Sequence, residues 1–337
     1  MRLGMLAPIS HRYPPDGYGP WERVTHDLTE RLIESGIEVT LFAAADSITT
    51  AELVATLPSS LERVPGPLHR ELEDDHIRTA LAESRRRKLD LVHSHLHVHV
   101  LALSGDEGPP IITTLHGVAW NPEIRELLFE HRYRPFVSLS DRERSFAPHL
   151  NYVGTVPNGI RVADFPLGSG EGGYLAFVGR LAPEKAAHLA VTVAQRAGRH
   201  LLVAGPIEAK YRDYAEMVVS APGVDYLGEL ERDNLSLLLQ DATALLMPLA
   251  WDEPFGLVVV ESMVSGTPVI AWRRGAMPEI VDDGVTGVLV DDVDEAVAAL
   301  GDVDGLDRAE CALVARKRFS DKAMAAGYEA IYQSALD

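Results

Sequence analysis

The sequence is poor in cysteine and in long hydrophobic runs, and each shortage excludes a class of protein. Its 337 residues include one cysteine, Cys311, which excludes an intramolecular disulfide framework and fits a reducing compartment. No apolar run is long enough to span a membrane. The N-terminal segment MRLGMLAPIS is too short for a secretion signal and is typical of a first strand. We therefore expect a cytoplasmic protein without stable membrane insertion.

Basic residues are also scarce. The chain has 31 lysines and arginines against 50 aspartates and glutamates, a formal net charge of −19. Binding to nucleic acid depends on Lys and Arg surfaces that neutralise phosphates, so nucleic acid is not an expected partner. One basic run, 85–88, ends a helix predicted over 69–88. Cations suit a helix C-terminus, and contact of this run with a membrane is the alternative.

A complete G-x-G-x-x-G is missing after the first predicted strand, so a dinucleotide site is not indicated. The pattern nevertheless predicts a strand over 2–9, a helix over 21–35 and a strand over 37–43, which form a Rossmann-like βαβ unit. The same alternation restarts at Tyr174, after the glycine-rich segment 166–173, which has the composition of a linker.

The length of the chain suits two α/β domains. We expect two domains, over 1–160 and 173–321.

The stretch 251–290 is the most informative part of the chain. A nearly all-apolar helix is predicted over 254–266, beginning at a proline and ending near a glycine. The free N–H groups of its first turn, Phe255 to Leu257, suit an anion. Glu261 lies about 6–9 Å further along the helix, about the step from a diphosphate to a ribose. Glu253 would face whatever the diphosphate carries, so the stretch predicts a nucleotide-sugar site.

Motifs in this stretch resemble a known family. It reads E-P-F-G-L-x-x-x-E, then S-G-T-P-V-I-A, then G-A-M-P-E-I-V-x-D-G-x-T-G. The combination resembles the donor-site signature of the family-four retaining glycosyltransferases. Similar family motifs are G-R-L-x-x-E-K at 179–185, T-x-H-G at 114–117 and P-N-G at 157–159. The resemblance implies an α/β protein of the GT-B fold, with two facing Rossmann-like domains and an interdomain cleft. The first, over 1–160, would be the acceptor domain, joined by a C-terminal helix over 322–337 that crosses back to it, and the second, over 173–321, would be the donor domain.

The resemblance also implies a reaction and a set of site residues. A sugar, of hexosyl type, would pass from a nucleotide-diphosphate donor to an acceptor hydroxyl with retention, by front-face attack and without a metal or other cofactor. UDP is the favoured nucleotide and GDP the next, and the acidic surface favours a small soluble acceptor. The expected catalytic residues are His116 and Glu253. The other expected contacts are Arg180, Lys185, Gly256, Leu257 and Gly19 for the diphosphate; Glu253, His116, Pro254 and Phe255 for the sugar; Glu261 for the ribose; and Gly17, Tyr18 and Ser140 for the acceptor region.

Three positions depart from the family pattern. Pro20 replaces the second glycine of G-G-x-E and removes an N–H donor near the diphosphate. Ala186 replaces the last glycine of G-R-L-x-x-E-K-G, and Arg161 stands where aspartate is usual.

Two metal patterns have structural alternatives. Histidines recur at every second position over 93–99, and four imidazoles on one side of a strand would suit Zn²⁺. No acidic or cysteine partner accompanies them, and the family carries D-x-V-H-x-H at a strand end, so we expect His93 and His95 at the edge of a cleft. The run D-D-V-D at 291–294 suits a helix N-terminus rather than a metal.

Two other functions fit parts of this pattern. A nucleotide-sugar epimerase on a related fold would change the sugar with no acceptor, and a non-catalytic protein would bind the nucleotide sugar only. The joint presence of Glu253, Glu261, Arg180 and Lys185 favours the transferase.

Overall fold

The chain forms two compact units, each built on its own parallel sheet. The computed structural model describes residues 1–62, 64, 66–96, 98–105 and 108–336. One unit comprises Met1–Gly159 with Asp321–Asp337, and the other comprises Ile160–Ser320. This finding confirms the predicted α/β class with two Rossmann-like folds.

The first unit contains a seven-stranded sheet in the order β3-β2-β1-β4-β5-β6-β7, in which every paired strand is parallel. The order reverses between β1 and β4, and ligand sites of open α/β sheets form at the carboxyl ends of strands beside such a point. The strands are β1 (Arg2–Leu6), β2 (Glu38–Ala44), β3 (Glu52–Leu57), β4 (Leu91–Ser94), β5 (Ile111–Thr114), β6 (Phe136–Ser138) and β7 (Tyr152–Thr155).

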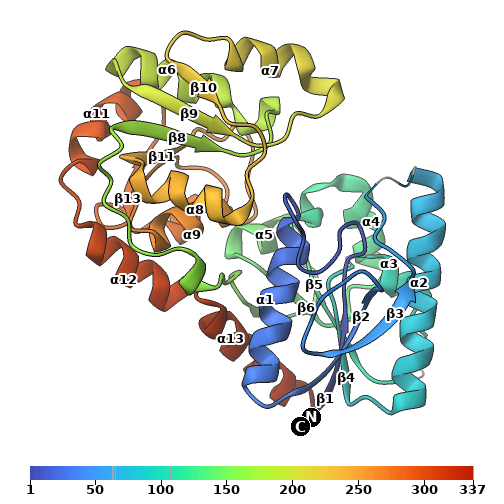
Figure 1. Cartoon of the computed structure of the whole chain (residues 1–337). Coiled ribbons are helices and arrows are strands. Elements are labelled where there is room, and N and C mark those ends of the chain that lie inside the picture. Colours follow the sequence, from blue (N-terminus) through green and yellow to red (C-terminus); the bar gives the residue numbers. More distant parts are fainter. Residues whose placement is uncertain (63, 65, 97, 106–107, 337) are drawn as a thin grey trace. The chain divides into compact units, whose positions relative to one another are not determined.

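Helices flank this sheet, and in Figure 1 α1 and α2 stand on either side of its strands. The α-helices are α1 (Pro20–Glu34), α2 (Gly66–Arg87), α3 (His99–Leu103), α4 (Pro122–Glu130), α5 (Asp141–Phe146) and α13 (Asp321–Leu336), and short 3₁₀ turns cover Val118–Trp120 and, in the second unit, Val162–Asp164, Pro183–Lys185 and Ala209–Tyr211. The helix predicted over 21–35 is therefore present one residue earlier, and the first strand is shorter than the predicted 2–9. The edge strand β3 is one that the sequence pattern did not indicate.

The C-terminal helix α13 packs in the first unit, as predicted. Asp321, the first residue of α13, pairs with Arg31 on α1. The Nε and Nη2 atoms of Arg31 lie 3.1 and 2.7 Å from Oδ2 of Asp321. Further along, Tyr328 and Tyr332 are fully buried. The helix is thus anchored by one ion pair and by two large aromatic side chains.

The second unit contains a six-stranded parallel sheet in the order β10-β9-β8-β11-β12-β13. Its strands are β8 (Tyr174–Val178), β9 (His200–Ala204), β10 (Val224–Tyr226), β11 (Ala244–Met247), β12 (Val269–Trp272) and β13 (Gly287–Val290). Its helices are α6 (Ala187–Ala197), α7 (Arg212–Val219), α8 (Arg232–Asp241), α9 (Leu257–Val264), α10 (Met277–Ile280), α11 (Val293–Val303) and α12 (Arg308–Phe319).

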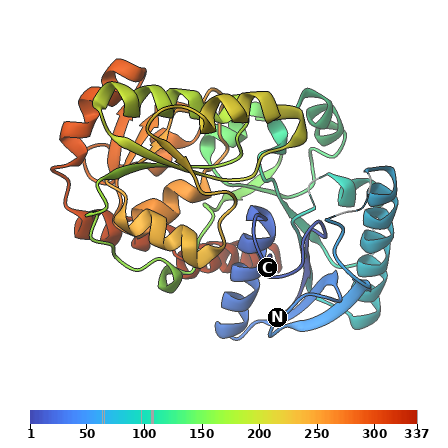
Figure 2. The same cartoon turned by 45° about the horizontal axis from the view of Figure 1, so that its top comes forward.

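Helices cover both faces of the second sheet. In Figure 1, α6, α7 and α11 lie on one side of the strands, and α8, α9 and α12 lie on the other. The turned view in Figure 2 keeps α6–α7 and α8 on opposite sides. Because both faces are buried, the central strands β8, β11 and β12 are continuously apolar rather than alternating.

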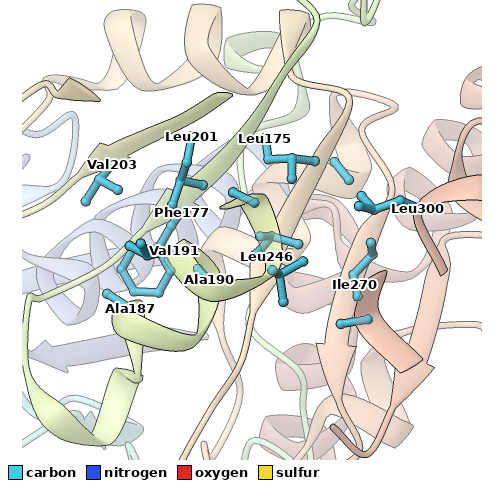
Figure 3. Packing of buried hydrophobic residues seen from close by; sticks show 14 of the residues in the cluster. Leu175, Phe177, Ala187, Ala190, Val191, Leu201, Val203, Leu246, Ile270 and Leu300 are labelled. Carbon is cyan, nitrogen blue, oxygen red and sulfur yellow. The ribbon is translucent and has the colours of Figure 1, made fainter. Parts of the chain in front are cut away.

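One large core of the second unit lies between the sheet and α6, α7 and α11. Small residues on α6, Ala187 and Ala190, let that helix approach the ring of Phe177 on β8 (Figure 3). The other labelled members of the cluster in Figure 3 are Leu175, Val191, Leu201, Val203, Leu246, Ile270 and Leu300. This packing holds the carboxyl ends of β8 and β11 in place.

The glycine-rich segment 166–173 is packed on the second unit. The division between the units lies earlier, between Gly159 and Ile160. The N–H groups of Gly168, Gly170 and Gly172 donate to the carbonyls of Ser265, Gln240 and Asp241 at 2.9, 3.0 and 3.0 Å. A Cβ at position 168 would overlap the backbone of Gln240. The glycines therefore allow close backbone contact, which linker composition alone did not reveal.

The helix predicted over 254–266 begins later than expected. It is α9 (Leu257–Val264), preceded by Gly256 at φ +100°, a conformation that favours glycine. Upstream of it, the carbonyl of Glu253 accepts from the N–H of Ala276 at 2.8 Å. Gly275, at φ +61°, lies so close to the backbone of Glu253 that a Cβ would overlap it. Contact with the loop after β12 thus keeps 253–256 out of the helix.

Candidate active site

The connection between β11 and α9 places Glu253 in a polar cluster. Its side chain is buried, with a residue exposure of 8%. Lys185 forms an ion pair with its Oε2 atom. The indole Nε1 of Trp251 donates to the same Oε2 at 2.9 Å. The Lys185 Nζ atom also lies over the Trp251 ring, 5.2 Å from its centroid. The sequence therefore predicted two members of this cluster and missed Trp251, two positions before Glu253.

Lys185 comes from the connection between β8 and α6. It ends the 3₁₀ turn Pro183–Lys185 and is followed by Ala186 at φ +53° and ψ +39°. This left-handed conformation is costly for alanine and easy for glycine. The family motif has a glycine at this position, so the departure noted in the sequence falls on a strained residue.

Arg180 lies at the carboxyl end of β8 and is held by two carboxylates. Its Nη2 atom is 3.1 Å from Oε1 of Glu184, and its Nη1 atom pairs with Glu208. Lys210 also contacts Glu208, at 3.0 Å. Hydrogen bonds from Lys210 and Arg180 lower the pKa of Glu208, which therefore stays ionised. An incoming anion must compete with these carboxylates for Arg180.

The first turn of α9 differs from the expected anion site by two positions. Since the helix begins at Leu257, its leading N–H groups belong to Leu257 and Val258 rather than to Phe255. Phe255 is buried against Phe319, with ring centroids 6.0 Å apart, so its side chain is directed into the core. Glu261 lies one turn into the helix and is partly exposed.

His116 lies two residues after the end of β5, in the first unit, and is 4% exposed. Its Nε2 atom lies 2.8 Å from Nδ1 of His95, which is completely buried. The ring of Trp21 lies beside it, with centroids 6.0 Å apart. A hydrogen bond between two ring nitrogens holds one proton, so the tautomers of His95 and His116 are coupled.

Glu143, which no sequence motif singled out, fixes the loop next to His116. Its Oε1 accepts from the N–H of Gly117 at 2.5 Å, and its Oε2 accepts from the N–H of Leu139 at 2.7 Å. Burial raises the pKa of this carboxyl group to about 8, against the lowering effect of the two N–H donors. Ser140 and Glu143 have the S-x-x-E spacing of a helix capping box, and this spacing is the sequence signal that could have identified Glu143.

The residues expected near the acceptor lie around the start of α1 and α5. Ser140 is buried and caps α5, where its Oγ accepts from the N–H of Glu143 at 3.1 Å. Gly19 precedes α1, and a Cβ there would lie 2.8 Å from the Cβ of Pro15. Gly17 and Tyr18 precede it in the loop, and Tyr18 is 42% exposed.

The histidines over 93–99 have different environments. His93 is fully buried, and its two ring nitrogens lie 2.7 Å from the hydroxyls of Tyr332 and Thr114. It is therefore an interior residue, and the prediction that it lies at a cleft edge was wrong. His99 instead pairs with Glu73 on α2, and His97 lies outside the described residues. Burial lowers the pKa of His93 to about 3.

Across the described parts of the chain, no group of three His, Cys, Asp or Glu side chains is arranged to hold a metal ion. In the run 291–294, Asp292 caps α11 by accepting from the N–H of Glu295 at 2.9 Å, which confirms the predicted helix start. In the basic run 85–88, Arg86 and Arg87 both pair with Glu83. No helix within the described residues combines the length and the apolar character needed to cross a membrane.

Each of the two units matches a model of a known protein family. A family model described as glycosyl transferases group 1 matches residues 163–303, and one described as glycosyltransferase family 4 matches residues 21–160. The chain is 29% identical to a phosphatidyl-myo-inositol mannosyltransferase of Mycolicibacterium smegmatis, over 94% of this chain and 88% of that protein.

Solved structures show the same fold. A sucrose-phosphate synthase from Thermosynechococcus elongatus is similar with a TM-score of 0.82 at 17% identity, covering 99% of this chain and 98% of that one. An Anabaena protein solved with UDP and glucose has a TM-score of 0.73 at 16% identity, covering 99% of each chain. With two family models that together span most of the sequence and GT-B structures that match its fold, the chain belongs to the family-four glycosyltransferases.

Proposed function

We propose that this glycosyltransferase moves a hexose from a nucleoside-diphosphate sugar to an acceptor hydroxyl, with retention at the anomeric carbon and without a metal. The observation that carries the proposal is the buried Glu253 carboxylate joined to Lys185 at the carboxyl ends of β8 and β11. Family membership favours the transferase over the two alternatives left by the sequence, an epimerase and a binding protein without chemistry.

Lys185 and Arg180 would neutralise the diphosphate. Cleavage of a glycosyl–phosphate bond leaves negative charge on the departing group, and fixed cations near a helix N-terminus stabilise such charge electrostatically. The N–H of Leu257 at the start of α9, next to Gly256, suits the same group, and Gly19 is proposed as a further diphosphate-binding residue. This arrangement supports a reaction that needs no bound metal.

Glu253 would accept hydrogen bonds from the hydroxyls of the donor sugar, next to Pro254 and the backbone of Phe255. Glu261, one turn into α9 and partly exposed, would bind the ribose. His116 is assigned to the reaction centre. The loop with Gly17 and Tyr18, together with Ser140, is assigned to the acceptor.

In the proposed step, the acceptor oxygen bonds to the anomeric carbon on the face from which the phosphate departs. The bond between that carbon and the phosphate oxygen breaks, and the acceptor proton passes to the departing oxygen. The products are a glycoside and a nucleoside diphosphate. No covalent glycosyl-enzyme forms, so trapping one would contradict this mechanism.

The donor is proposed to be a UDP-sugar, with a GDP-sugar next. The similar Anabaena protein was solved with UDP and glucose, and the mycobacterial relative is named for mannosyl transfer. The formal charge of −19 supports a small soluble acceptor. A cytoplasmic site of action belongs to the same proposal, and the single cysteine, Cys311, is free and buried.

The test begins with a thermal-shift panel of UDP, GDP, ADP and their sugars. A ligand at about a hundred times its Kd adds about 2.7 kcal/mol of stability. The sugar nucleotide that binds is then incubated with candidate acceptors, and proton NMR of the product reports the anomeric configuration. Glu253→Ala and Lys185→Ala should abolish transfer while circular dichroism stays native. Unchanged turnover in both variants would refute the assigned site.

A further inference from the structure

The two oxygens of Glu253 have different environments. Both protein donors, the ammonium of Lys185 and the indole N–H of Trp251, reach Oε2. Among the residues that the structure describes, Oε1 accepts no hydrogen bond. One oxygen is therefore anchored by the protein, and the other is available to a ligand.

Lys185 cannot neutralise a bound diphosphate and the carboxylate of Glu253 equally well. Under the proposed function it neutralises the donor diphosphate, and it must then weaken its contact with Oε2. Glu253 is only 8% exposed, so water cannot replace the lost contact fully. A buried carboxylate that loses a partner costs free energy unless another donor satisfies it.

From this geometry we infer that Trp251 is a positioning residue, whose indole N–H holds Oε2 of Glu253 when Lys185 turns to a diphosphate. The inference rests on the proposed function. The indole contacts both groups at once, since its edge donates to Oε2 at 2.9 Å and its face lies 5.2 Å from Nζ. A cation over the face of tryptophan is attracted by the ring, so Lys185 stays near the site after it leaves Oε2.

The backbone around Trp251 is fixed on both sides. Before it, the N–H of Ala250 donates to the carbonyl of Glu184 at 3.0 Å, and the Ala250 carbonyl accepts from Nη1 of Arg274 at 2.7 Å. After it, Oδ1 of Asp252 accepts from the N–H of Gly275 at 3.1 Å. The segment that presents the indole is therefore held by hydrogen bonds on both sides of Trp251.

The test compares UDP binding to wild type, Trp251→Phe, Glu253→Gln and the double variant by calorimetry, with GDP and ADP as parallel probes. Phenylalanine keeps the ring and removes the N–H. A hydrogen bond to a charged group is worth about tenfold in affinity, so Trp251→Phe should weaken UDP binding by about tenfold. In the Glu253→Gln background, Trp251→Phe should have little effect on UDP affinity, because the glutamine carries no negative charge that needs the indole N–H. The matched control is Trp272→Phe on β12, which should bind UDP as wild type does.

Each outcome decides the inference. It is overturned by wild-type affinity in Trp251→Phe, or by an equal loss in the presence and absence of the Glu253 charge. If the wild type binds none of the three nucleotides, the proposed function fails instead. Urea unfolding of Trp251→Phe, Lys185→Met and their double variant then decides: a combined loss larger than the sum supports a shared carboxylate, and an additive loss overturns the inference.

Discussion

The carboxylate of Glu143 accepts a hydrogen bond from the N–H of Gly117, so a group on α5 holds the residue next to His116. Burial raises the pKa of this carboxyl group to about 8, above its ordinary value of about 4.3. The folded protein therefore binds the proton more tightly than the unfolded chain. The stability that results is complete at low pH and is lost as the pH rises through about 8.

We expect this loss to be measurable above about pH 7.5. Burial lowers the pKa of His76 to about 4 and that of His93 to about 3. These two groups raise stability with pH while the histidines of the unfolded chain titrate around their ordinary pKa of about 6.5, and this opposing effect is nearly complete by about pH 7.5. Above that pH, the free energy of unfolding of the wild type, measured in urea, should decline by at most about 1.4 kcal/mol per pH unit. Glu143→Gln should flatten this decline, and an unchanged slope would contradict the prediction.

Replacing His95 by alanine should slow transfer and leave donor binding intact. The hydrogen bond of 2.8 Å to His116 is lost, and a bond of this kind is worth up to about tenfold. Arg180 and Lys185 lie in the other unit, so KM for the donor should change little while kcat falls. Steady-state kinetics with a saturating acceptor measures both constants. His99→Ala, which removes a partner of Glu73 instead, serves as the control.

Ala186→Gly should stabilise the protein. A non-glycine residue in the left-handed region costs about 1–2 kcal/mol, which glycine would remove. Glycine also gives the unfolded chain more conformational freedom, and this offsets about 0.5–1 kcal/mol of the gain. A net gain of about 0.5–1 kcal/mol is therefore expected in urea unfolding. The neighbouring change Ala187→Gly, at the start of α6, should instead destabilise the protein by about 1 kcal/mol. Equal losses from both changes would contradict the strain at position 186.

Glu208→Gln should tighten the binding of a diphosphate. The carboxylate pairs with Arg180, and both side chains are about one-third exposed. Exposed pairs are worth about 0.2–1 kcal/mol, so a gain of up to about fivefold in UDP affinity is expected. Calorimetry measures it, with Glu216→Gln on α7 as a control for the change in net charge. A weaker affinity would show that Glu208 supports Arg180 rather than competing for it.

The sequence predicted the architecture because its patterns are local. Apolar strands separated by amphipathic helices specify a parallel sheet, and proline or glycine marks ends of several helices, among them α1, α4, α6 and α9. The resemblance to the family also brought Lys185 and Glu253 into one hypothesis, although 68 positions separate them along the chain. Their ion pair is consistent with a shared site.

The errors arose where tertiary contacts override local preference. The start of α9 is delayed because Gly275 packs on the backbone of Glu253, a contact that no pattern of single residues encodes. His93 is buried because α13, from the far end of the chain, supplies the hydroxyl of Tyr332. Trp251 was missed because nothing in its position distinguishes an indole that donates a hydrogen bond from one that only packs.

The packed segment 166–173 has a practical consequence for dissecting the enzyme. A fragment that starts at Gly173 would keep the motifs of the donor half but would remove the N–H donors to the carbonyls of Ser265 and Asp241 and one of the two donors to the carbonyl of Gln240. It would also leave Arg308 without the Gly168 carbonyl that accepts from its Nε at 3.2 Å. An excised donor half should therefore begin at Ile160, whose bridge to Ser320 ties both cut ends together.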